Sequence, residues 1–177
     1  MDYEYVINYF LRKTYFIRIF RGFFYIKTPR EIKYGLGRSI LELTAISLNK
    51  MNLHWYFGLY SALKFNNATH EFFNINYIVS NSLYRSKTII ISNNKFVFKK
   101  FKSDLLSFGI IENKEIKYSD LEKTILDLIY IWKYNSISEE KIVLNVSEYI
   151  NLLSLEKIDE YINYYPNSIK TIMKKIY

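Results

Sequence analysis

The chain has 177 residues, of which 50% are hydrophobic and 24% are charged. This length suits one ordinary domain with a small addition, and this composition excludes intrinsic disorder of the whole chain. The absence of cysteine excludes disulfides, thiolate metal sites and a cysteine nucleophile.

Positive charge is concentrated in the first part of the chain. Residues 1–102 contain 16 Lys or Arg and 5 Asp or Glu, a net charge of +11. Residues 103–177 contain 9 Lys or Arg and 12 Asp or Glu, a net charge of −3, and the two parts account for the total of +8. A basic region beside an acidic one predicts contact with a polyanion such as nucleic acid.

A membrane span requires about 18 or more nearly uncharged apolar residues, and the chain has no such run. The apolar N-terminus is interrupted by Arg12, Lys13, Arg18 and Arg21 and lacks a small-residue cleavage site, unlike a secretory signal. We therefore expect no membrane contact and a cytoplasmic location.

A short helix and a β-hairpin are expected first. Apolar residues at helical spacing predict a helix over Tyr3–Leu11. Two aromatic and β-branched runs, Tyr15–Phe20 and Phe23–Lys27, flank Arg21-Gly22 and predict a hairpin that ends at Pro29.

Glycines at positions 35 and 37 mark a break, so we divide the chain into residues 1–34 and residues 35–177. Ser39 and Glu42 form a capping box that predicts a helix over Ile40–Lys50. After a short connection at His54-Trp55, a second helix is expected over Tyr56–Phe65, where small residues would allow another element to approach closely.

The middle of the chain is rich in β-forming residues. Asn93-Asn94 is typical of a type I′ turn and predicts a hairpin between Thr88–Ser92 and Lys95–Phe101. Further strands are expected at Tyr77–Ser80, Ser107–Ile111 and Glu115–Tyr118.

The remaining chain is predicted to be helical. Ser119 and Glu122 resemble a capping box, and the apolar stripe that follows predicts a core helix to about Lys133. Further helical segments are expected at 138–142, 147–153, 155–164 and 168–177, with N-caps at Ser154 and Asn167 for the last two. The fold class is thus α+β, or mixed α/β, with C-terminal helices.

The basic residues of the N-terminal helix and hairpin are the candidate DNA-binding residues: Arg12, Lys13, Arg18, Arg21 and Lys27. A short helix followed by a basic hairpin is typical of the second half of a winged helix, where the helix enters the major groove and the wing contacts phosphates or the minor groove. We expect the five cations on one outward-facing ridge. The alternative is an amphipathic helix and hairpin that only cap the core.

A second basic cluster comprises Arg85, Lys87, Lys95, Lys99, Lys100 and Lys102. Strand alternation predicts that Lys99 and Lys100 point to opposite faces, so they cannot form one flat row of phosphate contacts. The cluster is interpreted as a solvated edge that resists aggregation, or as a surface for a partner protein or RNA.

Candidate catalytic patterns are sparse. The sequence has no phosphate-cradling loop and no nucleophile elbow, and its two histidines lie outside any ligand-spaced motif. Asp104, Glu112 and Lys114 form the weak pattern of a metal-dependent nuclease, for which the alternative is a solvated strand edge. We expect no enzymatic activity, no cofactor and no metal site.

Five segments, in order, resemble the AbiEi family of antitoxins. Arg18–Tyr25 resembles the arginine-rich wing, and Ser61-Ala62-Leu63 resembles the family's "SAL" helix. Lys87–Phe101 with Phe108-Gly109-Ile110 resembles its hairpin and following strand. Glu122–Leu128 is similar to the "EK-[TA]-LLDL" helix, and Leu155–Ile176 resembles the closing helices.

The resemblance implies a winged helix joined to an α/β or α+β domain, repression of its own operon, and neutralisation of a nucleotidyltransferase-like toxin. A full winged helix has two more helices before the position of Tyr3, so the short N-terminal element is expected to pack on the main domain or on a second subunit, as in a homodimer. A protein-interaction module without DNA binding is the alternative. For Glu122–Leu128 the structural interpretation is a core helix whose Lys123 and Asp127 form an i,i+4 pair worth about a few tenths of a kcal/mol.

Overall fold

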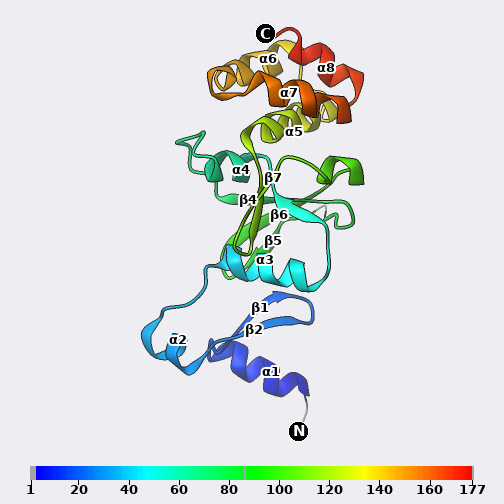
Figure 1. Cartoon of the computed structure of the whole chain (residues 1–177). Coiled ribbons are helices and arrows are strands. Elements are labelled where there is room, and N and C mark those ends of the chain that lie inside the picture. Colours follow the sequence, from blue (N-terminus) through cyan, green and yellow to red (C-terminus); the bar gives the residue numbers. More distant parts are fainter. Residues whose placement is uncertain (1–2, 86, 177) are drawn as a thin grey trace.

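The computed structural model describes residues 3–85 and 87–176 and has the mixed α+β fold expected from the sequence. The helices are α1 (Tyr3–Arg12), α2 (Pro29–Tyr34), α3 (Ile40–Lys50), α4 (Tyr60–Phe65), α5 (Leu121–Tyr134), α6 (Glu139–Ser147), α7 (Leu155–Tyr161) and α8 (Asn167–Met173). The strands are β1 (Phe16–Phe20), β2 (Phe23–Ile26), β3 (Trp55–Phe57), β4 (Ile75–Ser80), β5 (Ile89–Ile91), β6 (Asn94–Lys100), β7 (Ile110–Asn113) and β8 (Ile116–Ser119). Figure 1 shows an elongated molecule with α1 at one end and α6 to α8 at the other.

The expected N-terminal helix and hairpin are both present. Strands β1 and β2 pair antiparallel, with Phe16 opposite Ile26 and Phe20 opposite Phe23. The turn Arg21-Gly22 requires glycine, because Gly22 has φ 79°. Helix α2 was not predicted: Pro29, which was expected only to end the hairpin, is the first residue of this helix. Thr28 accepts a hydrogen bond from the Glu31 backbone and donates its own backbone N–H to the Glu31 carboxylate.

Six strands form the main sheet, in the order β5-β6-β4-β3-β8-β7. The pairs β4–β6 and β3–β8 are parallel, whereas the other three neighbours are antiparallel. Strand β3 lies near the centre of the sheet. For these residues the sequence predicted a connection at His54-Trp55 and the start of a helix at Tyr56. That prediction was wrong for Trp55–Phe57, because these three buried side chains alternate between two hydrophobic cores on opposite faces of the sheet.

The two cores are covered by different helices. Helix α3 and the hairpin cover the face that carries Trp55 and Phe57, whereas α4, α5 and the C-terminal helices cover the face that carries Tyr56. Two of the small residues lie close to β4, as predicted: an added Cβ at Gly58, just before α4, would lie 2.8 Å from a Val79 methyl carbon, and Ser61 of α4 accepts a hydrogen bond from the Tyr77 backbone N–H at 2.7 Å.

Several strand boundaries differ from prediction by a few residues. The β5–β6 turn is Ser92-Asn93, since Asn94 pairs with Ile91 and the two turn residues have φ 45° and 68°. This is the predicted turn type, one residue earlier. A 3₁₀ turn over Ser103–Leu106 delays the next strand, so β7 begins at Ile110.

The caps of the C-terminal helices are only partly as predicted. Asp120, not Ser119, caps α5 and accepts a hydrogen bond from the Lys123 backbone. Glu122 instead accepts a hydrogen bond from the backbone of Ser154, which caps α7 as expected. Pro166 occupies the N-cap of α8 in place of Asn167. The region 147–153 contains a 3₁₀ turn, Ile150–Leu152, in place of an α-helix.

A helix that crosses a bilayer must be long and predominantly apolar. In residues 3–85 and 87–176, no helix combines the length and the apolar character that crossing a bilayer requires.

Candidate nucleic-acid interface

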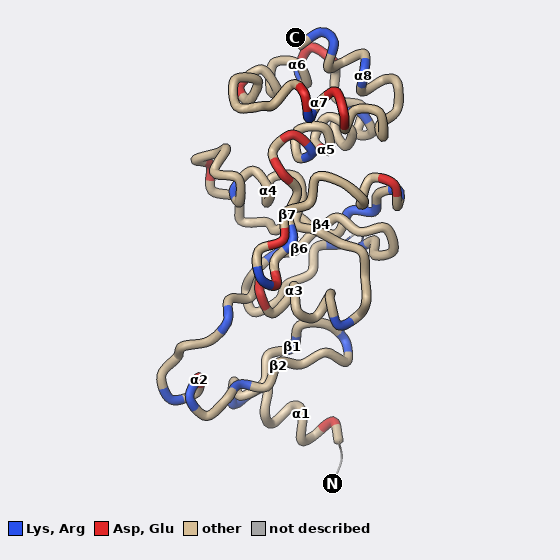
Figure 2. The backbone as a smooth tube through the Cα atoms, viewed as in Figure 1, with Lys and Arg blue, Asp and Glu red and all other residues tan. Residues whose placement is uncertain are grey.

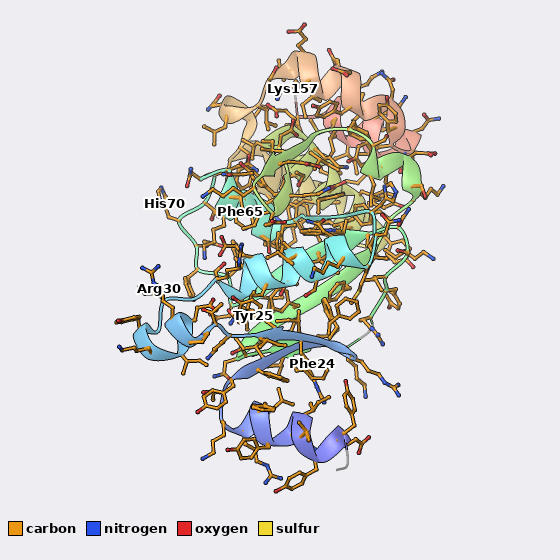
Figure 3. The ribbon with its side chains drawn as sticks, turned by 60° about the horizontal axis from the view of Figure 1, so that its bottom comes forward. Phe24, Tyr25, Arg30, Phe65, His70 and Lys157 are labelled. Atoms are coloured by element: carbon orange, nitrogen blue, oxygen red, sulfur yellow. The ribbon has the colours of Figure 1, made fainter. Side chains whose placement is uncertain are left out.

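The hairpin β1–β2 lies between helix α1 and the main domain. Ile19 is 3% exposed in the core that also contains α3, and the Phe20 ring lies 6.1 Å from that of Phe98. On the other side, Phe16 stacks on Phe10 of α1 with ring centroids 4.8 Å apart. Figure 3 shows α1 on the outer side of the hairpin, with Phe24 facing it. Helix α1 contributes no buried residue, so it forms an outer layer.

The segment formed by α1, the hairpin and α2, with the residues up to Arg38, is a strongly basic layer. Residues 3–38 contain eight Lys or Arg but only two Asp or Glu. Glu31 is already engaged, because the Tyr25 hydroxyl and the Thr28 backbone N–H donate hydrogen bonds to its carboxylate. The hydrogen bond from Tyr25 lowers the pKa of Glu31, and the same bond raises the pKa of Tyr25. Figure 2 shows the predominance of Lys and Arg around β1, β2 and α2.

The five candidate DNA-binding residues lie at two ends of the hairpin. Arg21 is in the turn and Arg18 is near it, with its guanidinium carbon 5.2 Å from the Phe24 ring centroid. Arg12 and Lys13 end α1, close in sequence to the open end, where Lys27 donates its backbone N–H to Tyr15. Four residues of strand, about 13 Å, separate the turn from the open end. The five cations therefore form a tip pair and a base group of three, in place of the single expected ridge.

The tip pair borders a groove between the hairpin and α1. Arg18, Arg21, Gly22 and Phe24 line it from the hairpin; Tyr3, Glu4, Ile7 and Asn8 line it from α1. The groove has a volume of about 520 Å³ and is open to solvent. Because Arg18 and Arg21 line a groove that is open to solvent, an anionic group can reach both guanidinium groups.

Two further groups of residues belong to this interface and were not among the predicted ones. Tyr5 and Tyr9 lie on the exposed face of α1 at i,i+4 spacing, and Arg12 continues the same face. Arg30 is exposed on α2 (Figure 3), and Arg38 is exposed between α2 and α3, so both extend the basic layer. The signal was present in the sequence, since the basic run continues past Lys27 with Glu31 as its only acid.

One ion pair lies in the interior of the protein. Lys123 and Asp127 are fully buried, and their side chains lie 3.3 Å apart. Tyr165 and Tyr56 donate hydrogen bonds to the two oxygens of Asp127 at 2.6 and 2.8 Å. Lys123 also lies 4.4 Å from the Phe108 ring centroid. The predicted i,i+4 pair is present, but the predicted few tenths of a kcal/mol apply to a solvated pair, whereas this pair is enclosed by the sheet and the C-terminal helices.

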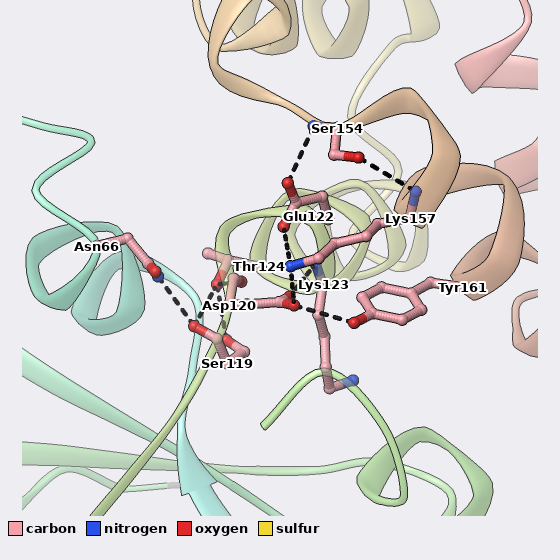
Figure 4. A network of polar contacts seen from close by, with 9 residues as sticks. All are labelled: Asn66, Ser119, Asp120, Glu122, Lys123, Thr124, Ser154, Lys157 and Tyr161. Atoms are coloured by element: carbon pink, nitrogen blue, oxygen red, sulfur yellow. Dashed lines mark hydrogen bonds and ion pairs between the residues drawn. The ribbon is translucent and has the colours of Figure 1, made fainter. Parts of the chain in front are cut away.

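A second layer of polar contacts surrounds the start of α5 (Figure 4). Asp120 accepts hydrogen bonds from Tyr161 at 3.0 Å and from Lys157 at 3.3 Å. Burial, followed by the Asp120 carboxylate, raises the pKa of Tyr161 to about 12. Every buried side-chain nitrogen and oxygen in the described part of the chain has a partner. This network holds α5, α7 and the sheet together.

The nuclease pattern is not assembled into a metal centre. Glu112 forms an ion pair with Lys117 at 3.0 Å across β7 and β8, and Lys114 lies in the turn between these strands. Asp104 is exposed in the 3₁₀ turn. Within residues 3–85 and 87–176, no group of three or more His, Asp or Glu side chains is arranged to hold a metal ion.

No family model matches the chain, and a search of curated proteins gives no significant match.

Proposed function

We propose that this protein is a non-catalytic, DNA-binding regulator of the antitoxin type, and that α1 and the β1–β2 hairpin bind duplex DNA. The main support is the composition of residues 3–38, which contain eight Lys or Arg but only two Asp or Glu and project from the main domain (Figure 2). Binding to phosphates needs such an excess, and folding of the main domain does not. The resemblance to AbiEi-type antitoxins supports the same proposal, and a cytoplasmic location follows from it.

The two groups of cations suggest how the interface works. Arg21 occupies the hairpin turn, the position from which a wing contacts phosphates or the minor groove. The exposed face of α1 presents Tyr5, Tyr9 and Arg12 in one stripe, so this helix would lie along the DNA. Each cation that neutralises a phosphate releases a counterion, so binding is expected to be strongly salt-dependent.

The test is a titration of a labelled duplex of about 20 base pairs, two helical turns, at several salt concentrations. The duplex is drawn from the region upstream of the gene, with a scrambled duplex beside it. Replacing Arg18 and Arg21 by alanine is expected to weaken binding and to reduce the salt slope by about 1.8, or about 0.9 for each lost phosphate contact.

The matched control removes two exposed lysines at the far end of the molecule, by Lys141→Ala together with Lys174→Ala. This variant loses the same charge and is expected to bind as the wild type does. Wild-type protein that fails to bind at low salt, or a tip variant that matches the control, would contradict the DNA-binding part of the proposal.

A partner protein is the second candidate ligand, and a specific surface favours it. Ile32, Tyr34 and Leu36 are 45%, 59% and 70% exposed on and after α2, an apolar strip beside the basic layer. By the family resemblance, the partner would be a nucleotidyltransferase-like toxin, and the protein would neutralise it by binding.

Co-purification with a nucleotidyltransferase-like protein encoded beside the gene tests this second function. Leu36→Glu is expected to reduce the amount of partner retained, because it places a charge in the apolar strip. Leu144→Glu is the control, since Leu144 is 68% exposed on α6, far from the strip. Independent elution of the two wild-type proteins, or equal loss in both variants, would rule this function out.

A further inference from the structure

A second groove lies on the opposite side of the sheet from the hairpin. Tyr84, Lys99, Lys100 and Phe101 line it from the sheet; Tyr130, Ile131, Tyr134 and Asn135 line it from the end of α5. Its volume is about 540 Å³, within the range of small-molecule sites. Phe101 and Tyr130 belong to the core on the α5 face, whereas the hairpin packs on the α3 face. The groove is therefore separate from the proposed duplex interface.

The short strand β5 creates the open edge beside this groove. It pairs only with residues Asn94 to Phe96 of β6. The last residues of β6, up to Lys100, thus lack a strand neighbour on that side among the described residues. Lys99 and Lys100 are the last two residues of β6, where they pair with Val79 and Ser80 of β4, and both line the groove.

The groove is electropositive. Its lining includes two lysines and no acid, and the sequence from residue 72 to residue 103 contains six Lys or Arg and no Asp or Glu. Neither Lys99 nor Lys100 forms an ion pair with an acid of the described chain. The carboxyl end of α5 contributes about half a negative charge, which two full positive charges outweigh. An anionic ligand is therefore favoured.

Aromatic rings complete the groove in two different ways. Tyr130 packs on Phe101 with ring centroids 5.2 Å apart, so these two rings form a fixed floor. Tyr84 and Tyr134 are 62% and 79% exposed, and within residues 3–85 and 87–176 neither stacks on another ring. Exposed rings beside lysines provide the two contacts that an unpaired nucleotide needs: a stacking surface for the base and a cation for the phosphate.

We propose that this groove binds single-stranded nucleic acid, with bases stacked on Tyr84 and Tyr134 and the backbone held by Lys99 and Lys100. A single strand is favoured over a duplex, because bases in a duplex are already stacked on each other and do not expose their faces. It is favoured over an acidic peptide, because a peptide would use the lysines but not the two exposed rings.

Fluorescence anisotropy of a labelled uridine oligonucleotide of about 12 nucleotides tests the proposal, and a thymidine oligonucleotide compares RNA with DNA. Tyr134→Leu is expected to weaken binding at least about fivefold, the lower limit for loss of one stacked base, whereas Tyr134→Phe retains it. Lys99→Ala together with Lys100→Ala is expected to lower the salt slope by about 1.4, or about 0.7 for each phosphate. Circular dichroism checks that each variant is folded.

Two controls separate this site from other causes. Lys141→Ala with Lys174→Ala removes the same charge elsewhere and is expected to leave oligonucleotide binding unchanged. Arg18→Ala with Arg21→Ala is also expected to leave it unchanged, so failure of the duplex proposal would not affect this result. The inference is overturned if the wild-type protein does not bind the oligonucleotide at low salt, or if Tyr134→Leu and Tyr134→Phe bind it with equal affinity. It is also overturned if a polyglutamate peptide displaces the oligonucleotide fully and binds Tyr134→Leu as tightly as it binds the wild type, because the site would then recognise negative charge alone.

Discussion

Asp127→Ala is expected to lower the free energy of unfolding by about 3–5 kcal/mol, the usual cost of removing one partner of a buried ion pair. The substitution leaves Lys123 buried without its carboxylate and leaves the hydroxyls of Tyr56 and Tyr165 without their acceptor. Burial already lowers the pKa of Lys123 and raises that of Asp127, so the protein spends free energy to keep these groups in its interior. Urea denaturation followed by circular dichroism measures the change.

A double variant distinguishes the loss of one partner from the loss of the pair. Lys123→Met with Asp127→Leu removes the unpaired buried charge and is expected to recover part of the lost stability, because the hydroxyls of Tyr56 and Tyr165 still lack their acceptor. Lys117→Met is the surface control, because its partner Glu112 remains solvated and the unfolding midpoint should change little. If Asp127→Ala unfolds at the wild-type denaturant concentration, the network does not stabilise the fold.

Gly109→Ala is expected to destabilise the protein by about 2–4 kcal/mol, the sum of backbone strain and overpacking. Gly109 has φ 60°, a conformation that L-residues with a side chain rarely adopt. An added Cβ would also lie 2.9 Å from the Lys123 Cβ and 3.0 Å from the Tyr161 ring. Neither neighbour can move freely, since Lys123 belongs to the central helix and Tyr161 is bonded to Asp120. Thermal and urea denaturation of the variant give the measurement.

Gly35→Ala is the matched control for the backbone contribution. Gly35 caps α2 with φ 67°, but an added Cβ there would meet no atom within 4 Å. This variant is expected to lose only about 1 kcal/mol. Equal losses at positions 35 and 109 would show that the close approach of Gly109 to Lys123 does not matter.

Local chemistry explains which elements of the fold were predictable. The turn Arg21-Gly22 needs a positive φ that glycine supplies, and Ser39 with Glu42 closes a capping box, so the hairpin and α3 lie where expected. By contrast, Trp55–Phe57 has no local signal that separates a strand from a helix. This segment forms a strand because Tyr56 is buried in the core on one face of the sheet and Trp55 and Phe57 are buried in the core on the other face.

The candidate interface was also predictable only in part. The excess of Lys and Arg before residue 103 follows from the sequence, and so do the five cations of the N-terminal helix and hairpin. Their division into a tip pair and a base group follows from hairpin register and from how α1 packs on it. The groove at Lys99 and Lys100 depends on the length of β5 and on the end of α5, which are far apart in the sequence.

The sequence alone thus determined elements whose formation depends on neighbouring residues: the hairpin turns, the helix caps at Ser39 and Ser154, and the distribution of charge. Tertiary structure decided the rest, namely which strand lies at the centre of the sheet, that Lys123 and Asp127 are enclosed, and which cations share a surface. The physical reason is that capping and turn formation depend on groups a few residues apart. Burial and the grouping of charges depend on contacts between segments that only the folded chain brings together.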